Sequence, residues 1–268
     1  MPSFTLIDTH CHLDAPEFDA DRDAVREAAR RLGVVRCVLA AVHPKHFARV
    51  RDLAHAWGDF YAVGIHPLYT ENADENDLRA AGDFLKTNAG DAALAAVGEI
   101  GLDYFVPAYK HAPLRDKQRH FFVHQLNLAR EFHRPVLLHS RRAVDDCLYE
   151  VRRSGTVGIA HAFSGSAQQA QRFLDLGWKL GFGGAFTHPR AVRLRTLARD
   201  LPLDAVVLET DAPDMPPRWL CSPGQPPQRN TPAELPRIAA ELAALRGVPP
   251  ETVAQVTTRT AVALLSRT

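Results

Sequence analysis

The sequence alternates short β-rich runs with amphipathic helical stretches along its whole length. Eight β-rich runs occur, at Thr5–Asp8, Val35–Val42, Tyr61–Ile65, Leu94–Glu99, Pro135–His139, Val157–His161, Lys179–Ala185 and Ala205–Glu209. Strands that alternate with helices pair in parallel through helical crossovers, and eight such units suit a closed (β/α)8 TIM barrel. An open, doubly wound sheet is the competing α/β arrangement.

The helical stretches carry apolar residues at spacings of three and four, as Leu114–Phe132 shows most clearly. The others are Asp21–Leu32, His46–Trp57, Asp77–Asn88, Val144–Arg153, Ala167–Leu176 and Ala191–Arg199. Glycines follow three of them in the position that favours a positive φ, namely Gly33, Gly58 and Gly177. Two further helices, Ala233–Leu245 and Glu251–Leu265, are expected to cover the last strand. No repeat or linker interrupts this pattern, so we expect a single TIM-barrel domain over residues 1–268.

Polar residues gather at the predicted carboxyl ends of the strands, where TIM barrels carry their active sites. Six of the eight strands end on histidines or carboxylates, and these are His10, His12, His66, Glu99, His139, His161, Glu209 and Asp211. Buried imidazoles and carboxylates that converge on one point repel or stay unpaired unless a metal compensates them. The sequence therefore predicts a metal site at this end of the barrel.

The residue types at these strand ends indicate which ions would bind. A mixed shell of histidine and carboxylate suits Mg²⁺, Mn²⁺ or Zn²⁺ and excludes a structural thiolate zinc site. Six candidate ligands exceed the needs of one tetrahedral ion, so two divalent metal ions that share a carboxylate are favoured. Such a pair activates a water molecule and stabilises both oxygens of a displacement. His10 and His12 face the same side of an extended strand, which leaves Cys11 to pack on the other.

A proline-rich segment, Ala212–Thr231, follows the last predicted strand and contains six prolines and Trp219. Loops of this length in compact domains are usually functional or disordered. Because each proline ring fixes φ, we interpret this segment as a rigid rim, with a poorly ordered surface loop as the alternative.

Composition limits the location and the partners of the protein. Apolar residues make up 46% and charged residues 24%, which is typical of a folded globular chain, and no apolar run is long enough to span a membrane. The first residues lack a secretory signal, and the four cysteines show no paired spacing, so we expect a cytoplasmic protein. A formal net charge of +1 excludes a broad polybasic surface but not a small basic site. No obligatory protein partner is evident.

The chain resembles the TatD-related deoxyribonuclease family of metal-dependent hydrolases over essentially its whole length. The resemblance is carried by Asp8–Leu13, Gly98–Tyr104 and Glu209–Pro213. Within that family, Phe163–Ala170 and Asp211–Pro216 look like the YjjV-type branch. Gln228–Pro232 is a weaker match to the family's Arg-Asn-x-Pro.

This resemblance implies a metallo-dependent hydrolase barrel that cleaves phosphodiester bonds, often as a 3′-exonuclease. By motif position, His10, His12, Glu99 and Asp211 would hold one metal, while Glu99, His139 and His161 would hold the second. His66 would lie near the scissile phosphate. The expected substrate is single-stranded DNA or another phosphodiester.

Other site residues can be weighed by charge and position. Asp211 is the candidate that both binds metal and accepts the proton of the attacking water, and Glu209 should orient a ligand or that water. Arg141 or Arg142 should point into the barrel mouth and bind phosphate, or else begin the next helix in solvent. Tyr104 and its neighbours Phe105 and Tyr109, together with Trp219, either stack a base or only pack.

Two alternatives remain. An amidohydrolase-type enzyme would hydrolyse a C–N or carboxyl-ester bond of a small molecule, and its binuclear members bridge their metals with a carbamylated lysine near the end of strand four. Here that strand ends on Glu99, and none of the five lysines takes the place, which favours the nuclease-like branch. A barrel that only binds nucleic acid would not explain six strands that end in potential metal ligands.

Overall fold

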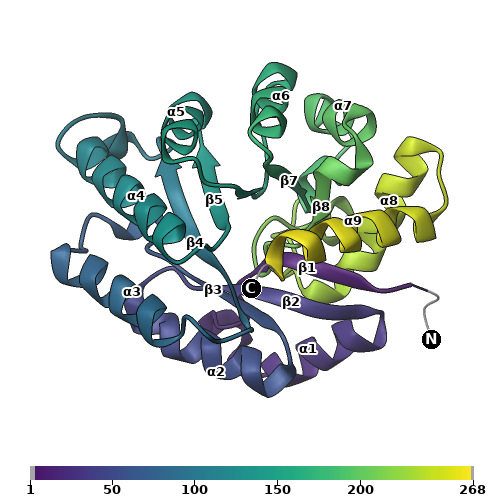
Figure 1. Cartoon of the computed structure of the whole chain (residues 1–268). Helices are drawn as coiled ribbons and strands as arrows, with labels where there is room; N and C mark the ends of the chain where they lie inside the picture. Colours follow the sequence, from purple (N-terminus) through teal and green to yellow (C-terminus); the bar gives the residue numbers. More distant parts are fainter. Residues whose placement is uncertain (1–3, 267–268) are drawn as a thin grey trace.

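The computed structural model describes residues 4–266 as a ring of parallel strands surrounded by helices (Figure 1). Its strands are β1 (Leu6–Cys11), β2 (Val34–Ala40), β3 (Phe60–Val63), β4 (Leu94–Asp103), β5 (Val136–Arg141), β6 (Gly158–Ala160), β7 (Lys179–Phe182) and β8 (Val206–Leu208). They form one sheet in sequence order, and each strand pairs in parallel with the next. The predicted (β/α)8 barrel is confirmed, and the open doubly wound sheet is wrong.

All predicted helices are present, with ends that shift by a few residues. They are α1 (Arg22–Arg31), α2 (Phe47–Trp57), α3 (Glu75–Thr87), α4 (Leu114–Glu131), α5 (Val144–Ser154), α6 (Ala167–Asp175), α7 (Val192–Asp200), α8 (Leu235–Arg246) and α9 (Pro250–Leu265). Gly33, Gly58 and Gly177 all have positive φ where the chain leaves a helix, as predicted. No helix within residues 4–266 is both long and apolar enough to cross a membrane.

β4 runs four residues further than the sequence pattern predicts. We expected this strand to end at Glu99, but Ile100–Asp103 continue it by pairing with Leu138–Arg141 of β5. Pairing with a neighbouring strand is a tertiary effect, which the local pattern of apolar residues does not record. The extension carries Asp103 to the same end of the barrel as His139.

β1 and β8 close the ring beyond the end of the last strand. The hydroxyl of Thr9 donates to the Leu208 carbonyl at 3.1 Å. Further along, the Asp211 amide donates to the His10 carbonyl at 2.9 Å, and the His12 amide donates to the Ala212 carbonyl at 2.7 Å. The seam between the first and the last strand is therefore fastened at the carboxyl end of the barrel.

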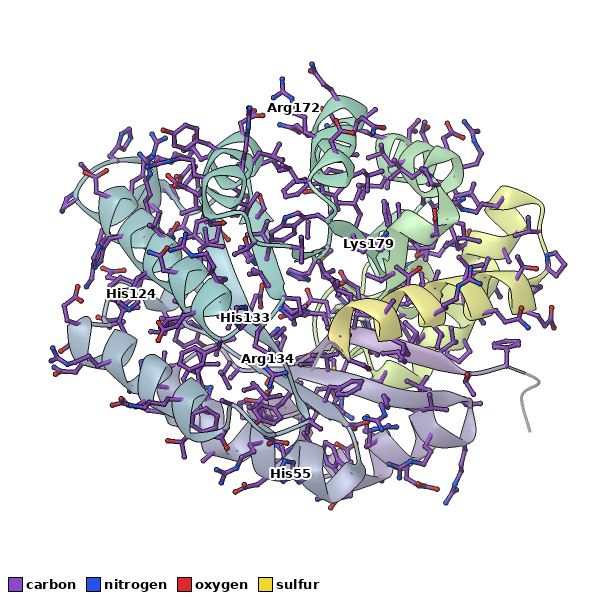
Figure 2. All side chains as sticks on the ribbon, viewed as in Figure 1. His55, His124, His133, Arg134, Arg172 and Lys179 are labelled. Atoms are coloured by element: carbon purple, nitrogen blue, oxygen red, sulfur yellow. The ribbon has the colours of Figure 1, made fainter. Side chains whose placement is uncertain are left out.

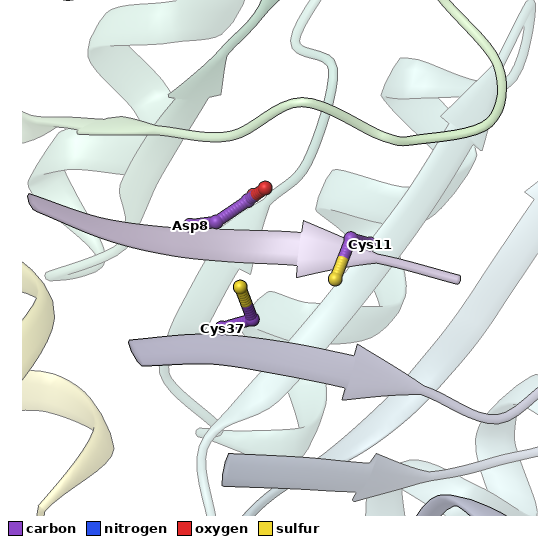
Figure 3. Close-up of side chains that lie close together, drawn as sticks. All are labelled: Asp8, Cys11 and Cys37. Atoms are coloured by element: carbon purple, nitrogen blue, oxygen red, sulfur yellow. The ribbon is translucent and has the colours of Figure 1, made fainter. Parts of the chain in front are cut away.

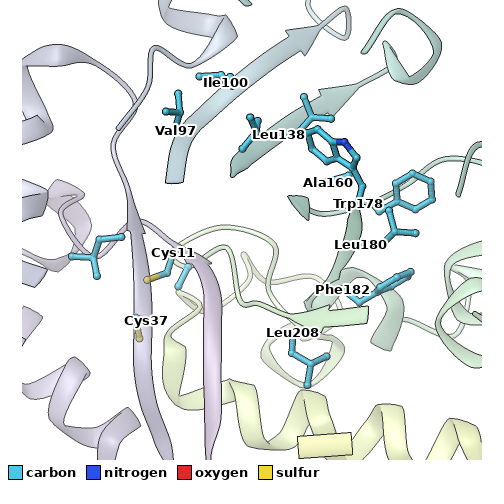
Figure 4. Close-up of a cluster of buried hydrophobic side chains, with 14 of the residues drawn as sticks. Cys11, Cys37, Val97, Ile100, Leu138, Ala160, Trp178, Leu180, Phe182 and Leu208 are labelled. Atoms are coloured by element: carbon cyan, nitrogen blue, oxygen red, sulfur yellow. The ribbon is translucent and has the colours of Figure 1, made fainter. Parts of the chain in front are cut away.

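Apolar side chains fill two layers. The outer layer lies between strands and helices and includes Trp178 and Phe182 (Figure 4). The inner layer fills the barrel with residues such as Leu137, Ile159 and Val207, and Leu264 of α9 packs against it. Because side chains alternate along a strand, the positions two residues beyond these three inner residues also point inward. Those positions are His139, His161 and Glu209.

A buried ion pair joins α1 to the starts of β2 and β3. Arg26 donates to Asp59 through Nε at 2.5 Å and Nη2 at 2.6 Å, and both side chains are almost completely buried. The same guanidinium donates to the carbonyls of Val34 and Val35, and Asp59 accepts the Cys37 amide at 2.9 Å. This group lies at the amino ends of the strands, opposite to the predicted metal site.

Candidate metal centre

The strand-end histidines and carboxylates converge at the carboxyl end of the barrel. A cavity of about 610 Å³ opens there, lined by His12, His66, Glu99, His139, His161 and Asp211 among others. His10 lies beneath it and is fully buried. The structure thus brings together all six residues that were predicted to bind metal, as well as His66.

Glu99 occupies the middle of this group, and its two oxygens face different sets of histidines. Oε2 lies 3.2 Å from His10 Nε2 and 3.5 Å from His12 Nε2. Oε1 lies 2.6 Å from His139 Nδ1 and 3.0 Å from His161 Nε2. One carboxylate is therefore shared between two clusters of nitrogen ligands.

The first cluster has the spacing of a metal cradle. Asp211 Oδ1 lies 3.5 Å from His10 Nε2 and 3.6 Å from His12 Nε2, and these two nitrogens are 3.2 Å apart. Ligand atoms at about 2.0–2.1 Å from one tetrahedral zinc ion lie roughly 3.3 Å from one another. The nitrogens of His10 and His12 therefore lie from Glu99 and from Asp211 at about the spacing that ligands of one divalent ion have.

Hydrogen bonds of the rings decide which nitrogen of each histidine is free. Nδ1 of His12 lies 2.8 Å from the Ala40 carbonyl, which can only accept, so Nδ1 carries a proton and Nε2 is the nitrogen that faces the carboxylates. Nε2 of His139 lies 3.1 Å from Asp103, and its Nδ1 faces Glu99 at 2.6 Å. Each ring thus presents one nitrogen to the centre, and that nitrogen would bind a metal after losing any proton that it carries.

His66 is held in the opposite way. Its Nδ1 accepts the Leu68 amide at 3.1 Å, so in the neutral ring the proton must lie on Nε2. That nitrogen faces His139 Nδ1 at 3.2 Å and Glu99 Oε1 at 3.5 Å. His66 is therefore arranged as a hydrogen-bond donor at the edge of the second cluster, although its position alone would also allow metal binding.

Glu209 lies behind His161, away from Glu99. Its Oε1 accepts the Ala162 amide at 2.5 Å and lies 3.4 Å from His161 Nδ1, while Oε2 has no hydrogen-bond partner among the described residues. A Cβ at Gly181 would lie 2.2 Å from Oε2, so only glycine leaves room for this carboxylate. Glu209 is placed to orient His161, and it does not line the cavity around Glu99.

Charges within the cluster shift the pKa values of its members. Burial alone lowers the pKa of His12, but hydrogen bonds with Asp211 and Glu99 raise it well above its usual value. Burial likewise lowers the pKa of His161, and the charges of Glu99 and Asp211 raise it well above. Burial raises the pKa of Glu99, but the nearby His66, His161 and His10 hold it well below its usual range. The group is thus a set of charged carboxylates that attracts cations, whether protons or metal ions.

Glycines in β4 allow β4 and β5 to approach closely. A Cβ at Gly98 would lie 2.5 Å from Leu137 Cβ, and one at Gly101, whose φ is +152°, would lie 1.9 Å from the His139 carbonyl oxygen.

Asp211 has a φ of 58° although it is not glycine, which is a costly conformation. The surrounding fold holds this strained backbone at the candidate metal centre, and strained residues are commonly found at functional sites.

The predicted substrate-binding residues lie in different places. Arg141 lines the metal cavity, and its guanidinium carbon is 3.6 Å from the centre of the Phe105 ring. Tyr104 is buried, its hydroxyl donates to Asp146 at 3.0 Å, and it lines a neighbouring cavity rather than that of the metal centre. Trp219 donates to Glu234 at 2.6 Å and packs against the core.

Two acidic residues of the site were not singled out from the sequence. Asp103 holds His139, and it could have been found by extending β4, because residues 99 and 103 share one face of a strand. Asp8 accepts the Thr210 amide at 2.9 Å and the Thr210 hydroxyl at 2.5 Å at the barrel seam. Thr210 is itself fully buried. Burial raises the pKa of Asp8 to about 7.

Hydrogen bonds join the end of the proline-rich segment to its beginning. Asn230 is fully buried, and its amide nitrogen donates to the carbonyls of Thr210 and Asp214, each at 2.8 Å. Arg229 pairs with Asp21 at 2.6 Å. The rim prediction fits this arrangement, and Asn230 lies in the stretch that matched the family motif only weakly.

Most histidines lie away from the centre. Figure 2 labels His55, His124 and His133, which lie on the outer ring of helices or beside it. His55, for example, forms an exposed contact with Asp91 at 2.8 Å. Position at a strand end therefore separates the site histidines from these three.

The donors of the centre suit borderline or hard divalent ions, because nitrogen and carboxylate oxygen surround the cavity and no thiol does. Ligand atoms of Asp8, Cys11 and Cys37 also lie within 4.8 Å of one another, but the two thiols lie between β1 and β2 and both oxygens of Asp8 accept hydrogen bonds from Thr210 (Figure 3). Cys11 is fully buried on the side of β1 opposite to His10 and His12, as predicted.

Comparisons with known proteins agree on one group of relatives. Residues 7–266 match the family described as TatD related DNase. The chain is 40% identical over 253 residues to the uncharacterized metal-dependent hydrolase YjjV of Escherichia coli, with 93% of each chain covered. The crystal structure of that TatD homologue superposes with a TM-score of 0.88, covering 98% of each chain at 37% identity. The human deoxyribonuclease TATDN3 is 30% identical over 271 residues, with 98% of this chain and 95% of that protein covered.

Proposed function

The chain belongs to the TatD-related DNase family and is similar to metal-dependent hydrolases, and on this premise we propose that it hydrolyses phosphodiester bonds of single-stranded nucleic acid from the 3′ end. The observation that carries the proposal is the carboxylate of Glu99, whose two oxygens face two separate sets of histidines. A shared carboxylate of this kind is what two neighbouring divalent ions require. The name of the relative TATDN3, a deoxyribonuclease, supports the choice of bond.

The proposed ligand sets follow from the two clusters. His10, His12, Glu99 and Asp211 would hold one ion, and Glu99, His139 and His161 would hold the other. Such ions lower the pKa of a water molecule and stabilise negative charge on a phosphoryl group. Mg²⁺, Mn²⁺ and Zn²⁺ all suit these ligands.

The chain's own residues then bind the substrate and move the proton. Asp211 borders the cavity, so its carboxylate can accept the proton of the attacking water as well as bind an ion. His66 carries its proton on Nε2, which can donate to a phosphate oxygen next to the second cluster. Arg141 offers a second donor from the cavity wall. Glu209 keeps the ring of His161 in position from behind.

The shape of the site favours a chain end over a duplex. The cavity lies in the barrel mouth, and Asp214 and Met215 of the proline-rich segment form part of its wall. A concave pocket of this kind admits a flexible end more readily than a continuous double helix. Because the net charge is only +1, most of the affinity must come from the metal centre and a few arginines.

Digestion of two labelled substrates tests this proposal. We expect metal-loaded protein to shorten a 5′-labelled linear single strand into a descending ladder and to leave a closed single-stranded circle uncut. Glu99→Ala is the matched inactive control. Rapid cutting of the circle would disprove cleavage from the 3′ end. Brisk hydrolysis of an amide or lactone without any phosphodiester cleavage would disprove the proposed nuclease activity.

A further inference from the structure

A second cavity, of about 520 Å³, adjoins the metal cavity and shares Ser164 with it. We call it the lateral basin, and its wall includes Tyr104, Arg142, Ser164, Ser166, Gln169 and Arg193. Guanidinium, hydroxyl and amide groups, together with the carboxylates of Asp145 and Asp146, surround a space that opens directly beside the proposed scissile position. None of the proposed roles at the metal centre uses this space.

The turn after β5 divides two successive arginines between the two cavities. Arg141 lines the metal cavity, and Arg142 lines the lateral basin. The guanidinium carbons of the two lie 3.6 Å and 4.8 Å from the centre of the Phe105 ring. The two guanidiniums therefore lie near the same ring, while each arginine lines a different cavity.

Arg142 adopts a backbone conformation that does not suit it. Its φ is 57°, in the left-handed region where glycine is at ease and a side chain with a Cβ is disfavoured. Local strain of this kind is found mainly at functional sites. The arginine side chain is thus placed at the basin although glycine would relax the turn.

The charges of the basin leave Arg142 available for an anion. Of its two carboxylates, Asp146 is paired with Arg115 at 2.7 Å and accepts the Tyr104 hydroxyl, and Asp145 lies 3.8 Å from Arg172. Arg193 donates to the Ser164 carbonyl at 2.8 Å, which holds it at the shared edge without neutralising its charge. Among residues 4–266, the side chain of Arg142 forms neither an ion pair nor a hydrogen bond, and its contact is with the Phe105 ring.

We propose that the lateral basin binds a second phosphate of a polynucleotide, adjacent to the phosphate that is cleaved at the metal centre. The proposal rests on the proposed function and narrows it, because it selects a chain with at least two phosphates over a small phosphodiester. The guanidinium of Arg142 supplies the charged hydrogen bonds, and the hydroxyls of Ser164 and Ser166 add neutral ones.

Arg142→Gly tests the basin without endangering the fold, since glycine is the residue that the positive φ favours. We expect kcat/KM for a single-stranded oligothymidylate to fall by about tenfold, mainly through KM, because one charged hydrogen-bonded contact is lost. Bis(4-nitrophenyl) phosphate has one phosphate, and its hydrolysis should stay unchanged. The matched control is Arg31→Ala, an exposed arginine on α1 that pairs with Glu27.

Salt dependence gives a second readout. The slope of log affinity for oligothymidylate against log salt should decrease by about 0.7 in Arg142→Gly, the value for one phosphate contact on a single strand. An equal loss of kcat/KM for both substrates, or oligothymidylate cleavage like that of the wild type, would overturn the proposal that the lateral basin binds a second phosphate.

Failure of the proposed function gives a different result. If the metal-loaded wild type hydrolyses no phosphodiester, the nuclease proposal is wrong, and the basin is then tested by the fluorescence anisotropy of labelled oligothymidylate in EDTA. Weaker binding of oligothymidylate by Arg142→Gly than by Arg31→Ala would support a phosphate site in the lateral basin, and equal binding would overturn it.

Discussion

Asp59→Ala should destabilise the barrel without disturbing the metal centre. The variant removes a carboxylate that accepts two hydrogen bonds from Arg26 and one from the Cys37 amide. It leaves the Arg26 guanidinium almost fully buried, with only the carbonyls of Val34 and Val35 as partners. Breaking a buried ion pair by removing one partner costs about 3–5 kcal/mol, because the other charge stays buried and uncompensated.

This loss should be visible in urea unfolding followed by circular dichroism, as a fall of about 3–5 kcal/mol in the free energy of unfolding. At roughly 2–4 °C per kcal/mol, the melting temperature should fall by about 6–20 °C. Metal content should stay at the wild-type level, because the pair lies at the opposite end of the strands.

The double variant Arg26→Met/Asp59→Ala separates the charge from the packing. Replacing both members of a buried pair by residues without charge is often nearly neutral, so the double variant should be more stable than Asp59→Ala alone. A loss below about 1 kcal/mol in Asp59→Ala, the range of exposed pairs, would refute the reasoning. So would a double variant no more stable than the single one.

Three further predictions concern the site. Glu99→Ala should lose bound metal, measured by elemental analysis, and several orders of magnitude in turnover while its circular dichroism is retained; normal metal content and activity would contradict a shared carboxylate. Gly101→Ala should displace His139 and lower both stability and metal content, because its Cβ would lie 1.9 Å from the His139 carbonyl oxygen, whereas Gly90→Ala, with no atom within 4 Å, should change neither. The pKa of Asp8 is about 7 in the folded protein and 3.8 in the unfolded chain. Between these pH values the folded protein binds more protons than the unfolded chain. The free energy of unfolding should therefore fall as the pH rises from about 4 to about 7. Asp8→Asn removes this contribution, and the difference in unfolding free energy between wild type and variant should therefore change across that pH range; a constant difference would count against it.

The sequence predicted the barrel because the information it needs is local. Each strand and helix has its own apolar pattern, and parallel order follows from their alternation. The carboxyl ends of the strands must then meet at one edge, which is why His10, Glu99 and His161 could be grouped from the amino-acid sequence alone. The same rule would have included Asp103 if β4 had been extended to its true end.

Other features depend on contacts between distant parts of the chain, and these could not be predicted. The pairing of Arg26 with Asp59 joins residues 33 positions apart that carry no motif. The proton position on His66 depends on the Leu68 amide, which only the backbone geometry reveals. Tyr104 turns toward Asp146 rather than the metal cavity because α5 brings that carboxylate within reach.

The seam between β1 and β8 sets the time at which the centre is completed during synthesis. His10 and His12 leave the ribosome early, whereas Asp211, whose amide is fastened to the His10 carbonyl, emerges about two hundred residues later. A nascent or truncated chain that stops before the eighth strand has its first two candidate ligands but lacks the last one and the hydrogen bonds that position all three. The candidate ligands are therefore brought together only after the eighth strand has been made and the ring has closed.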